Sequence, residues 1–131
     1  MGLNDLERQR LEKLEELREA GWDPYPPRAE RTHTAAQAIA AFEAGGEGEE
    51  VVVPGRLRSI RVLGKASFAH IEDRSGKIQL FLRLNDLGED IYDRFKQNFD
   101  LGDFVEAKGT LMRTRTGEIT VRVGRLRMLA K

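Results

Sequence analysis

At 131 residues, the chain is long enough for one compact domain with a small extension and short for two typical domains. The absence of cysteine excludes a disulfide framework and a cysteine-based zinc site, and it suits a reducing compartment. The net charge of zero hides a split, since residues 1–50 hold 6 basic and 12 acidic side chains whereas residues 51–131 hold 16 and 10. Either the basic half has a polyanionic partner, or the acidic half merely keeps itself solvated.

Residues 1–48 are predicted to form a helical extension and a proline-rich connector. Residues 4–21 place leucines close to one face of a charged helix, which needs a surface to lie on. Three prolines in "WDPYPPR" then require an extended connector. Thr34 and Gln37 form a capping-box pattern that opens a second short helix, predicted over residues 35–44.

The hydropathy of the chain argues against a membrane protein. No apolar run approaches the ~18 residues that a helix needs to span a bilayer. The N-terminal segment "MGLNDLERQRLEKL" is charged throughout, unlike a secretory signal with its apolar middle. We therefore expect a soluble, cytoplasmic protein that has no membrane partner.

Residues 49–131 change from a helical to an alternating period and are predicted to form one β domain. Three strands, a helix and two more strands match the five-stranded oligonucleotide/oligosaccharide-binding (OB) Greek-key barrel, so the fold class is mainly β with flanking α-helices. A generic small antiparallel barrel is the alternative. The strands are predicted over residues 51–62, 66–73, 77–84, 103–113 and 118–128, and the helix over residues 86–97.

The second and third strands single out one face of this barrel. Alternation puts Phe68 and His70 on one side of "SFAHIED", and it puts Gln79 and Phe81 on one side of "KIQLFL". If the "DRSG" turn leaves two residues unpaired, His70 lies opposite Gln79, and Phe68 lies opposite Phe81. The alternating alanine, isoleucine and leucine side chains then line the core, and the other four residues form one outer patch.

Such a patch is typical of surfaces that bind single-stranded nucleic acid. An aromatic ring offers a stacking platform worth ~1–3 kcal/mol per base, and the amide of Gln79 can pair with the edge of a pyrimidine such as uracil. The alternative is that the phenylalanines pack beneath the N-terminal helix, which we favour for Phe81. We favour binding for Phe68 and Gln79, because OB barrels bind through their second and third strands. His70 either contacts RNA or is a solvated strand histidine.

The two loops expected beside this patch are basic, as a groove that follows RNA phosphates requires. They are "RSIRVLGKAS", between the first two strands, and "RTRTGE", between the last two. Glu118 in the second loop either accepts a hydrogen bond from a base N–H or forms a salt bridge with Arg115. The basic residues assigned to these two regions are Arg56, Arg58, Arg61, Lys65, Arg113 and Arg115.

Several short motifs together resemble one protein family. "GKASF", "GKIQLF", "LGED", "DLGD" and "RTGE" are similar to motifs of the anticodon-binding domain of bacterial lysyl-tRNA synthetases, which are class II enzymes. "KLEELREAGWDPYP" looks like the N-terminal helix and connector of that family, so the resemblance covers nearly the whole chain. It implies that the partner is a lysine tRNA with a UUU-type anticodon.

The resemblance carries binding roles to individual residues by matching position. Phe68 looks like the aromatic residue that stacks on an anticodon base, Gln79 like the amide that reads the central uridine, and Glu118 like the acid that contacts a flanking base. Arg61 resembles a basic contact to the anticodon loop, but Ile60 stands where many members carry a second basic residue, which leaves the contacting side chain open. The predicted RNA-binding residues are Arg61, Lys65, Phe68, His70, Gln79, Arg115 and Glu118.

The resemblance also implies what this stretch of chain does not do. In class II synthetases a separate, larger domain activates the amino acid with ATP, and none of its three motifs is present. We therefore expect no catalysis and no cofactor or metal, since ATP and Mg²⁺ would belong to that domain. The family dimerises largely through contacts outside this stretch, which leaves a monomer open. Three alternatives remain: an aspartyl or asparaginyl synthetase domain, a sequence-tolerant single-strand binder, and a structural module built on the leucine-striped helix.

Overall fold

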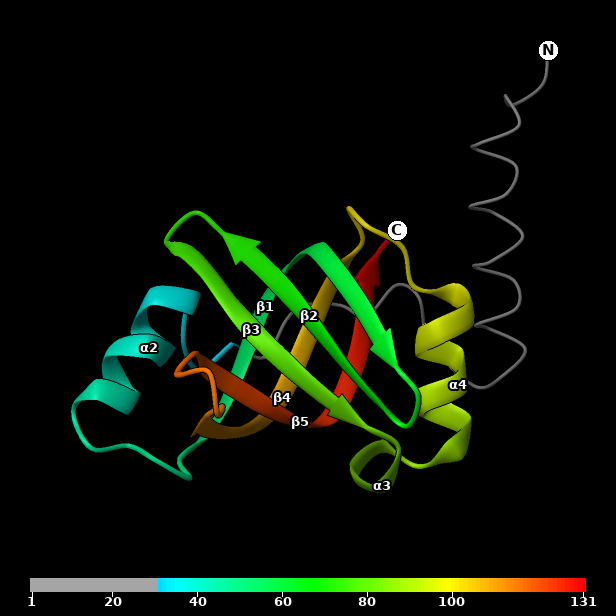
Figure 1. Cartoon of the computed structure of the whole chain (residues 1–131). Coiled ribbons are helices and arrows are strands. Elements are labelled where there is room, and N and C mark those ends of the chain that lie inside the picture. The colour runs from blue at the N-terminus through cyan, green and yellow to red at the C-terminus, as the bar shows by residue number, and fades with distance from the viewer. Residues whose placement is uncertain (1–30) are drawn as a thin grey trace, which may run out of the picture.

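Within residues 31–131, the part of the chain that the computed structural model describes, five strands close into a barrel (Figure 1). The predicted N-terminal helix and proline connector lie outside the described residues. Between residues 31 and 131, no helix is long and apolar enough to cross a membrane. The elements in chain order are α2 (Ala35–Glu43), β1 (Glu50–Leu63), β2 (Ala66–Asp73), β3 (Gly76–Arg83), α3 (Leu84–Leu87), α4 (Glu89–Asn98), β4 (Phe104–Arg113) and β5 (Ile119–Ala130).

The strands follow the order β1-β2-β3-β5-β4 around the barrel, and β4 pairs back with β1. Every pairing is antiparallel except that of β3 with β5, which is parallel. This order, with helical residues between β3 and β4, confirms the predicted five-stranded OB barrel. The parallel closure excludes the generic antiparallel barrel, and the strand bounds lie within two residues of the predicted ones.

The first strand is long because it pairs with two neighbours. Residues 50–56 pair with β4, and residues 56–63 pair with β2. The register with β2 shifts between Leu57 and Ser59, which marks a β-bulge at Arg58. The bulge bends β1 around the barrel and sets which side chains of its second half face outward.

The core forms where the inward-facing residues of the five strands meet. Strand β2 shows the alternation clearly, since the partly exposed Phe68 and His70 alternate with the fully buried Ala69 and Ile71. Burying an aliphatic or aromatic side chain of this size contributes roughly 1.5–3 kcal/mol. The largest fully buried side chains are Tyr92, Phe95, Leu57, Ile71, Ile78, Leu80, Leu82, Leu111, Met128, Val51 and Val53.

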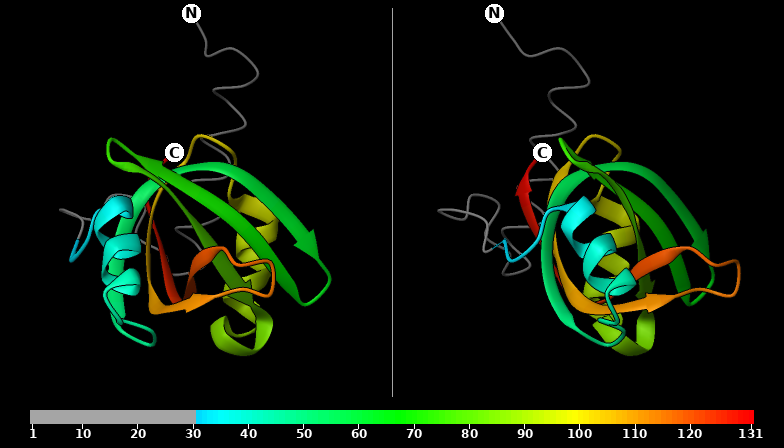
Figure 2. Two further views of the ribbon diagram at one scale, coloured as in Figure 1. Left: turned by 60° about the vertical axis from the view of Figure 1, so that its left-hand side comes forward. Right: turned by 90° about the vertical axis from the view of Figure 1, so that its left-hand side faces the viewer.

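Helices α2 and α4 lie on opposite sides of the barrel, as the views in Figures 1 and 2 show. Helix α2 buries Ala35 and Ala38 against the barrel core. The predicted capping box is confirmed: Thr34 Oγ1 accepts a hydrogen bond from the Gln37 amide at 3.2 Å, and Gln37 Oε1 accepts one from the Thr34 amide at 2.9 Å.

The turn between β2 and β3 completes the cap of α2. Asp73 Oδ2 accepts a hydrogen bond from the Ala35 amide at 2.9 Å, and Ser75 Oγ accepts one from the Ala36 amide at 2.9 Å. Partial burial alone would raise the pKa of the Asp73 carboxyl. Hydrogen bonds from the Ser75 hydroxyl and from three backbone amides outweigh it, so that the pKa lies below its ordinary value.

We expect Asp73→Asn to lower the free energy of unfolding at pH 7 by ~1 kcal/mol, because a charged acceptor at a helix N-terminus is lost. The depressed pKa means that this contribution is present above the carboxyl pKa of the unfolded chain and is lost as the pH falls through the folded pKa. Urea unfolding at several pH values should therefore show the two proteins converging in acid. Asp93→Asn, on the exposed side of α4, is the control, and a constant gap between wild type and Asp73→Asn at all pH values would contradict the charge effect.

The helical residues between β3 and β4 differ from the prediction. A single helix over residues 86–97 was expected, but the structure has α3 and α4, separated by Gly88. The φ angle of Gly88 is +88°, a conformation that side chains disfavour and that ends α3 before α4 begins. The chain thereby changes direction between α3, which follows β3 directly, and α4.

Helix α4 fixes the turn between β1 and β2. The buried Tyr92 donates a hydrogen bond from its hydroxyl to the carbonyl oxygen of Gly64 at 2.9 Å, and it lies 2.8 Å from the hydroxyl of Ser67. On the other side of the turn, the Leu84 amide donates to the carbonyl oxygen of Lys65 at 2.9 Å. The turn is therefore held in place next to the outer patch predicted from the sequence.

Candidate nucleic-acid interface

Two rows of side chains cross the outer face of β1, β2, β3 and β5, each with one residue from every strand. The register of β2 with β3 pairs His70 with Gln79 and Phe68 with Phe81, which confirms the predicted pairing. Strand β1 extends each row on one side and strand β5 extends it on the other. We name them the ring row (Arg61, Phe68, Phe81 and Arg122) and the amide row (Ser59, His70, Gln79 and Thr120).

The ring row holds two stacked aromatic side chains between cations. The rings of Phe68 and Phe81 lie 4.9 Å apart with an angle of 19° between their planes. The guanidinium of Arg61 lies 5.6 Å from the Phe68 ring centre, and that of Arg83 lies 5.8 Å from the Phe81 ring centre. Both rings are partly exposed, so they offer a flat surface to a ligand. The packing of Phe81 beneath the N-terminal helix concerns residues outside the described part.

The amide row is more buried and is joined by hydrogen bonds. Gln79 is only 8% exposed, and its Nε2 donates to Oγ1 of the fully buried Thr120 at 3.1 Å. The two ring nitrogens of His70 have different partners: Nδ1 lies 2.8 Å from Ser59 Oγ, and Nε2 lies 2.6 Å from Glu118 Oε2. His70 thus links β1 to the turn between β4 and β5.

Both rows border a groove of about 430 Å³ on this face. The turn between β4 and β5 and the tip of the β1-β2 hairpin project on the same side of the barrel, beside this face (Figure 2). Four of the predicted binding residues, Arg61, Phe68, Gln79 and Arg115, line the groove together. The other residues that line it are Phe81, Met112, Thr114 and Thr116.

Three predicted binding residues lie beside the groove and do not line it. Lys65 is exposed in the turn between β1 and β2, and His70 and Glu118 pair with each other. Within residues 31–131, the partner of the Glu118 carboxylate is His70 and not Arg115, with which the sequence suggested a salt bridge. The pair joins residues 48 positions apart in sequence and anchors the β4-β5 turn to β2.

Two arginines assigned to the first basic loop lie elsewhere. Arg56 and Arg58 belong to β1, because the strand continues through the bulge to Leu63 and leaves only a short turn. Arg58 Nε donates to Glu72 Oε1 at 2.8 Å, and the Arg56 guanidinium lies 6.0 Å from the ring centre of Phe104. Both arginines line a separate hollow away from the ring row, so the prediction that they flank the binding groove is wrong.

Sequence reasoning also missed residues that complete the groove. Met112, Thr114 and Thr116 come from the end of β4 and the turn that follows it. Thr120 alternates with the buried Val121 and would have been placed on the outer face by the same alternation that identified Phe68. Its position beside Gln79 requires the parallel pairing of β3 with β5, which alternation alone does not reveal.

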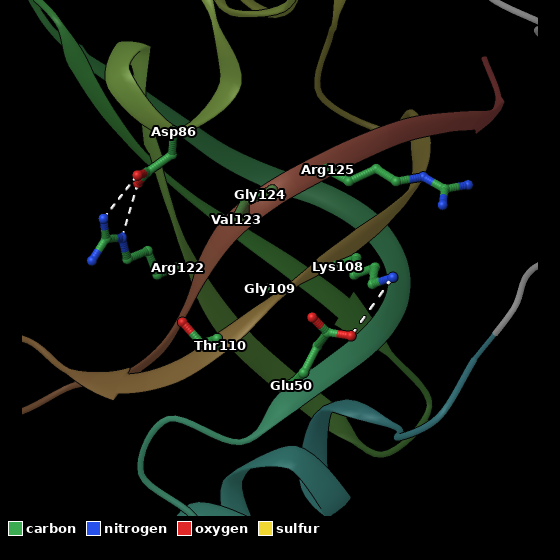
Figure 3. A pocket seen from close by; sticks show the side chains of 9 residues that line it. All are labelled: Glu50, Asp86, Lys108, Gly109, Thr110, Arg122, Val123, Gly124 and Arg125. Carbon is green, nitrogen blue, oxygen red and sulfur yellow. Dashed lines mark hydrogen bonds and ion pairs between the residues drawn. The ribbon is translucent and has the colours of Figure 1, made fainter.

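A second hollow of about 420 Å³ lies over the outer face of β4 and β5 (Figure 3). At its edge, Asp86 on α3 accepts two hydrogen bonds from Arg122, at 2.8 and 3.0 Å, and two from Arg83, at 2.9 and 3.1 Å. The hydrogen bonds from Arg122 and then from Arg83 hold the pKa of the Asp86 carboxyl well below its usual range. Lys108 lies 3.6 Å from Glu50, so two of the three cations that line this hollow, Lys108 and Arg122, are paired with acids.

Comparison with known proteins identifies similar sequences over the same region. Residues 51–129 match the family described as OB-fold nucleic acid binding domain. The whole chain is 56% identical to a lysine-tRNA ligase of Roseiflexus castenholzii and 48% identical to one of Chloroflexus aurantiacus. Over 98% of its length it is 46% identical to a lysine-tRNA ligase of Pelotomaculum thermopropionicum. The chain spans about a quarter of the length of these relatives, namely 27%, 27% and 25%.

Proposed function

The chain belongs to the family of OB-fold nucleic acid binding domains, as the anticodon-binding domain of lysine-tRNA ligases, and from this premise we propose that its groove recognises a UUU-type lysine anticodon. In this proposal the anticodon bases splay out of the loop and enter the groove that Arg61, Phe68, Gln79 and Arg115 line. The observation that carries the proposal is the juxtaposition, in one groove, of a stacked ring pair and a nearly buried amide.

The ring pair supplies affinity and the amide supplies selectivity. A base stacked on an aromatic side chain gains ~1–3 kcal/mol, whatever its identity, because every base has a π-face. Gln79 carries both a donor and an acceptor, and uracil presents an N–H between two carbonyl groups. A uridine held on Phe68 can therefore be distinguished from other bases by hydrogen bonds to Gln79.

The cations around the groove add a term that does not depend on sequence. Arg61 and Arg115 line the groove, and Lys65 stands exposed at the neighbouring hairpin tip. Contacts of such side chains with phosphates release counterions, so this part of the affinity falls as salt rises. The binding of a lysine anticodon should thus have a salt-sensitive part from the arginines and a salt-resistant part from stacking and base pairing.

In a longer protein like the relatives, this binding would select the tRNA for charging with lysine. The chemistry would take place in a separate domain that binds ATP and Mg²⁺, and the present domain would bind RNA without a cofactor. The same domain in an aspartyl or asparaginyl enzyme would also read a central uridine, but the relatives reported above are lysine-tRNA ligases.

The test of the proposed function is fluorescence anisotropy with anticodon stem-loops that carry UUU or CCC, at two salt concentrations. A preference for UUU that survives added salt would support base recognition. Equal and salt-sensitive binding of both hairpins would instead indicate a sequence-tolerant binder of single strands. No binding of either hairpin would leave only a structural module.

We expect Gln79→Ala to lower the preference for uridine over cytidine at the central anticodon position by ~1–3 kcal/mol if the pairing is bidentate. Stacking on Phe68 should be retained. The measurement is the ratio of the dissociation constants of hairpins with uridine or cytidine at that position. Gln97→Ala, an exposed glutamine on α4, is the matched control and should leave the ratio unchanged. An unchanged ratio in Gln79→Ala would remove this residue from the proposal.

A further inference from the structure

The amide of Gln79 contacts a hydroxyl whose two hydrogen bonds favour one orientation of the amide. Oγ1 of Thr120 lies 3.1 Å from Gln79 Nε2 on one side and 3.0 Å from the carbonyl oxygen of Glu118 on the other. Thr120 is fully buried and Gln79 is only 8% exposed, so the hydrogen bond between them is shielded from solvent water. The hydroxyl therefore sits between the amide and the start of the β4-β5 turn.

The chemistry of these groups fixes the direction of each hydrogen bond. A carbonyl oxygen can only accept, so the Thr120 hydroxyl makes both of its hydrogen bonds only when its single hydrogen is donated to Glu118. A lone pair on Oγ1 then accepts from Nε2 of Gln79, and an amide that presented Oε1 instead would cost one of these two hydrogen bonds. The two ends of a glutamine amide otherwise have nearly the same shape, and the orientation of the amide follows here from its partner.

This hydrogen bond leaves one acceptor and one donor of Gln79 for a ligand. Among residues 31–131, Thr120 is the partner found for the Gln79 side chain. Its Oε1 and the second hydrogen on Nε2 are thus available toward the groove, in a fixed order. If the amide rotated by half a turn about its Cγ–Cδ bond, the donor and the acceptor that face the groove would exchange places.

The order matters because uracil and cytosine differ by such a reversal. Uracil has a donor at N3 beside an acceptor at O4, whereas cytosine has an acceptor at N3 beside a donor at N4. For a pyrimidine stacked in one position, one orientation of an amide pairs with uracil, and the reversed orientation pairs with cytosine. A glutamine that is free to turn over would accept both bases.

We propose that Thr120 is a specificity-determining residue, which holds the Gln79 amide in one orientation and thereby allows uridine and rejects cytidine at the central anticodon position. The inference rests on the proposed function, since it presumes that Gln79 faces an anticodon base. Thr120 touches no base and acts through Gln79, so it is a positioning residue.

The test compares wild type, Thr120→Val and Thr120→Ser with hairpins that carry UUU or UCU, by fluorescence anisotropy at one salt concentration. Valine has the shape of threonine but no hydroxyl, and serine retains the hydroxyl. Wild type should prefer UUU by about 5- to 150-fold. Thr120→Val should bring the ratio to within about threefold, chiefly through tighter binding of the UCU hairpin, and Thr120→Ser should restore the preference.

The gain in cytidine binding is the readout that a merely structural role would not produce. A general loosening of the groove would weaken both hairpins, whereas a released amide strengthens one of them. The carbonyl oxygen of Glu118 keeps a hydrogen bond from the Thr114 amide, at 3.0 Å, in the valine variant. Thermal unfolding of each variant shows whether the barrel is intact.

Failure of the inference can be distinguished from failure of the proposed function. If wild type prefers UUU and Gln79→Ala loses that preference, but Thr120→Val keeps it, the role of Thr120 is overturned alone. If wild type itself shows no preference, the proposed function is overturned and the inference with it. Should the valine variant fail to fold, NMR of the wild-type side-chain amide decides: two sharp Gln79 Nε2 proton signals, one with a cross-peak to Thr120, support the inference, and exchange-broadened signals overturn it.

Discussion

Replacing Gly109 with alanine is expected to lower the free energy of unfolding by ~3 kcal/mol or more, because the barrel has no room for a β-carbon at this position. That atom would lie 1.9 Å from the carbonyl oxygen of Arg122 and 2.7 Å from its carbonyl carbon. Both are backbone atoms, so no flexible side chain can move aside. Strands β4 and β5 would have to separate at Gly109, which pairs with Val123.

Gly124→Ala is the matched control for this prediction. Gly124 lies on β5 at the same irregularity, where the register of β4 with β5 shifts between Lys108 and Gly109. A β-carbon on Gly124 would meet only the carbonyl oxygen of Lys108, at 4.0 Å. We expect this variant to stay within ~0.5 kcal/mol of wild type in urea unfolding. Equal stability of Gly109→Ala and wild type would contradict the close approach of the two strands.

Replacing Phe68 with alanine is expected to weaken binding of the UUU hairpin by about 5- to 150-fold, which corresponds to ~1–3 kcal/mol of lost stacking. Phe68 stacks on Phe81 at 4.9 Å and lines the groove beside Gln79. Since no phosphate contact is removed, the salt dependence of binding should stay unchanged. Anisotropy titrations at two salt concentrations measure both quantities.

The control for Phe68→Ala is Phe104→Ala. Phe104 is also partly exposed and also lies near an arginine, with the Arg56 guanidinium 6.0 Å from its ring centre, but it lines a different hollow. The two variants should lose similar amounts of stability, and only Phe68→Ala should lose affinity for the hairpin. Equal losses of affinity would indicate that the effect of Phe68 comes from the stability of the fold and not from stacking.

The sequence predicted most of the barrel because the period of a half-buried strand is simple. Alternation in β2 and β3 placed Phe68 and Gln79 on one face, and the two-residue turn after Asp73 fixed the register between the strands. Arg58 was misplaced for a different reason: it was assigned to a basic loop from the local composition, whereas β1 continues through a bulge at this residue to Leu63. The break at Gly88 was missed because the apolar period continues across it.

The parts of the site that could not be predicted depend on contacts between distant segments. Glu118 pairs with His70, whereas the sequence alone suggested either a base N–H or its near neighbour Arg115 as the partner. Thr120 lies beside Gln79 only because β3 and β5 pair in parallel, which cannot be deduced from either strand by itself. Period and composition describe one strand at a time, whereas a groove is made by the strands together.

The parallel pairing of β3 with β5 has a thermodynamic consequence. These strands share three residue pairs, fewer than any other neighbours in the barrel, and two of the three pairs are Gln79 with Thr120 and Phe81 with Arg122. The shortest strand pairing in the barrel therefore contains one residue pair from the ring row and one from the amide row. A ligand that binds only when β3 and β5 are paired shifts the equilibrium between the paired and the separated strands toward the paired state, by mass action. Gln79, the residue proposed to pair with the central anticodon base, is one of the three β3 residues that pair with β5. Anticodon binding would therefore be linked to the closure of the shortest strand pairing in the barrel.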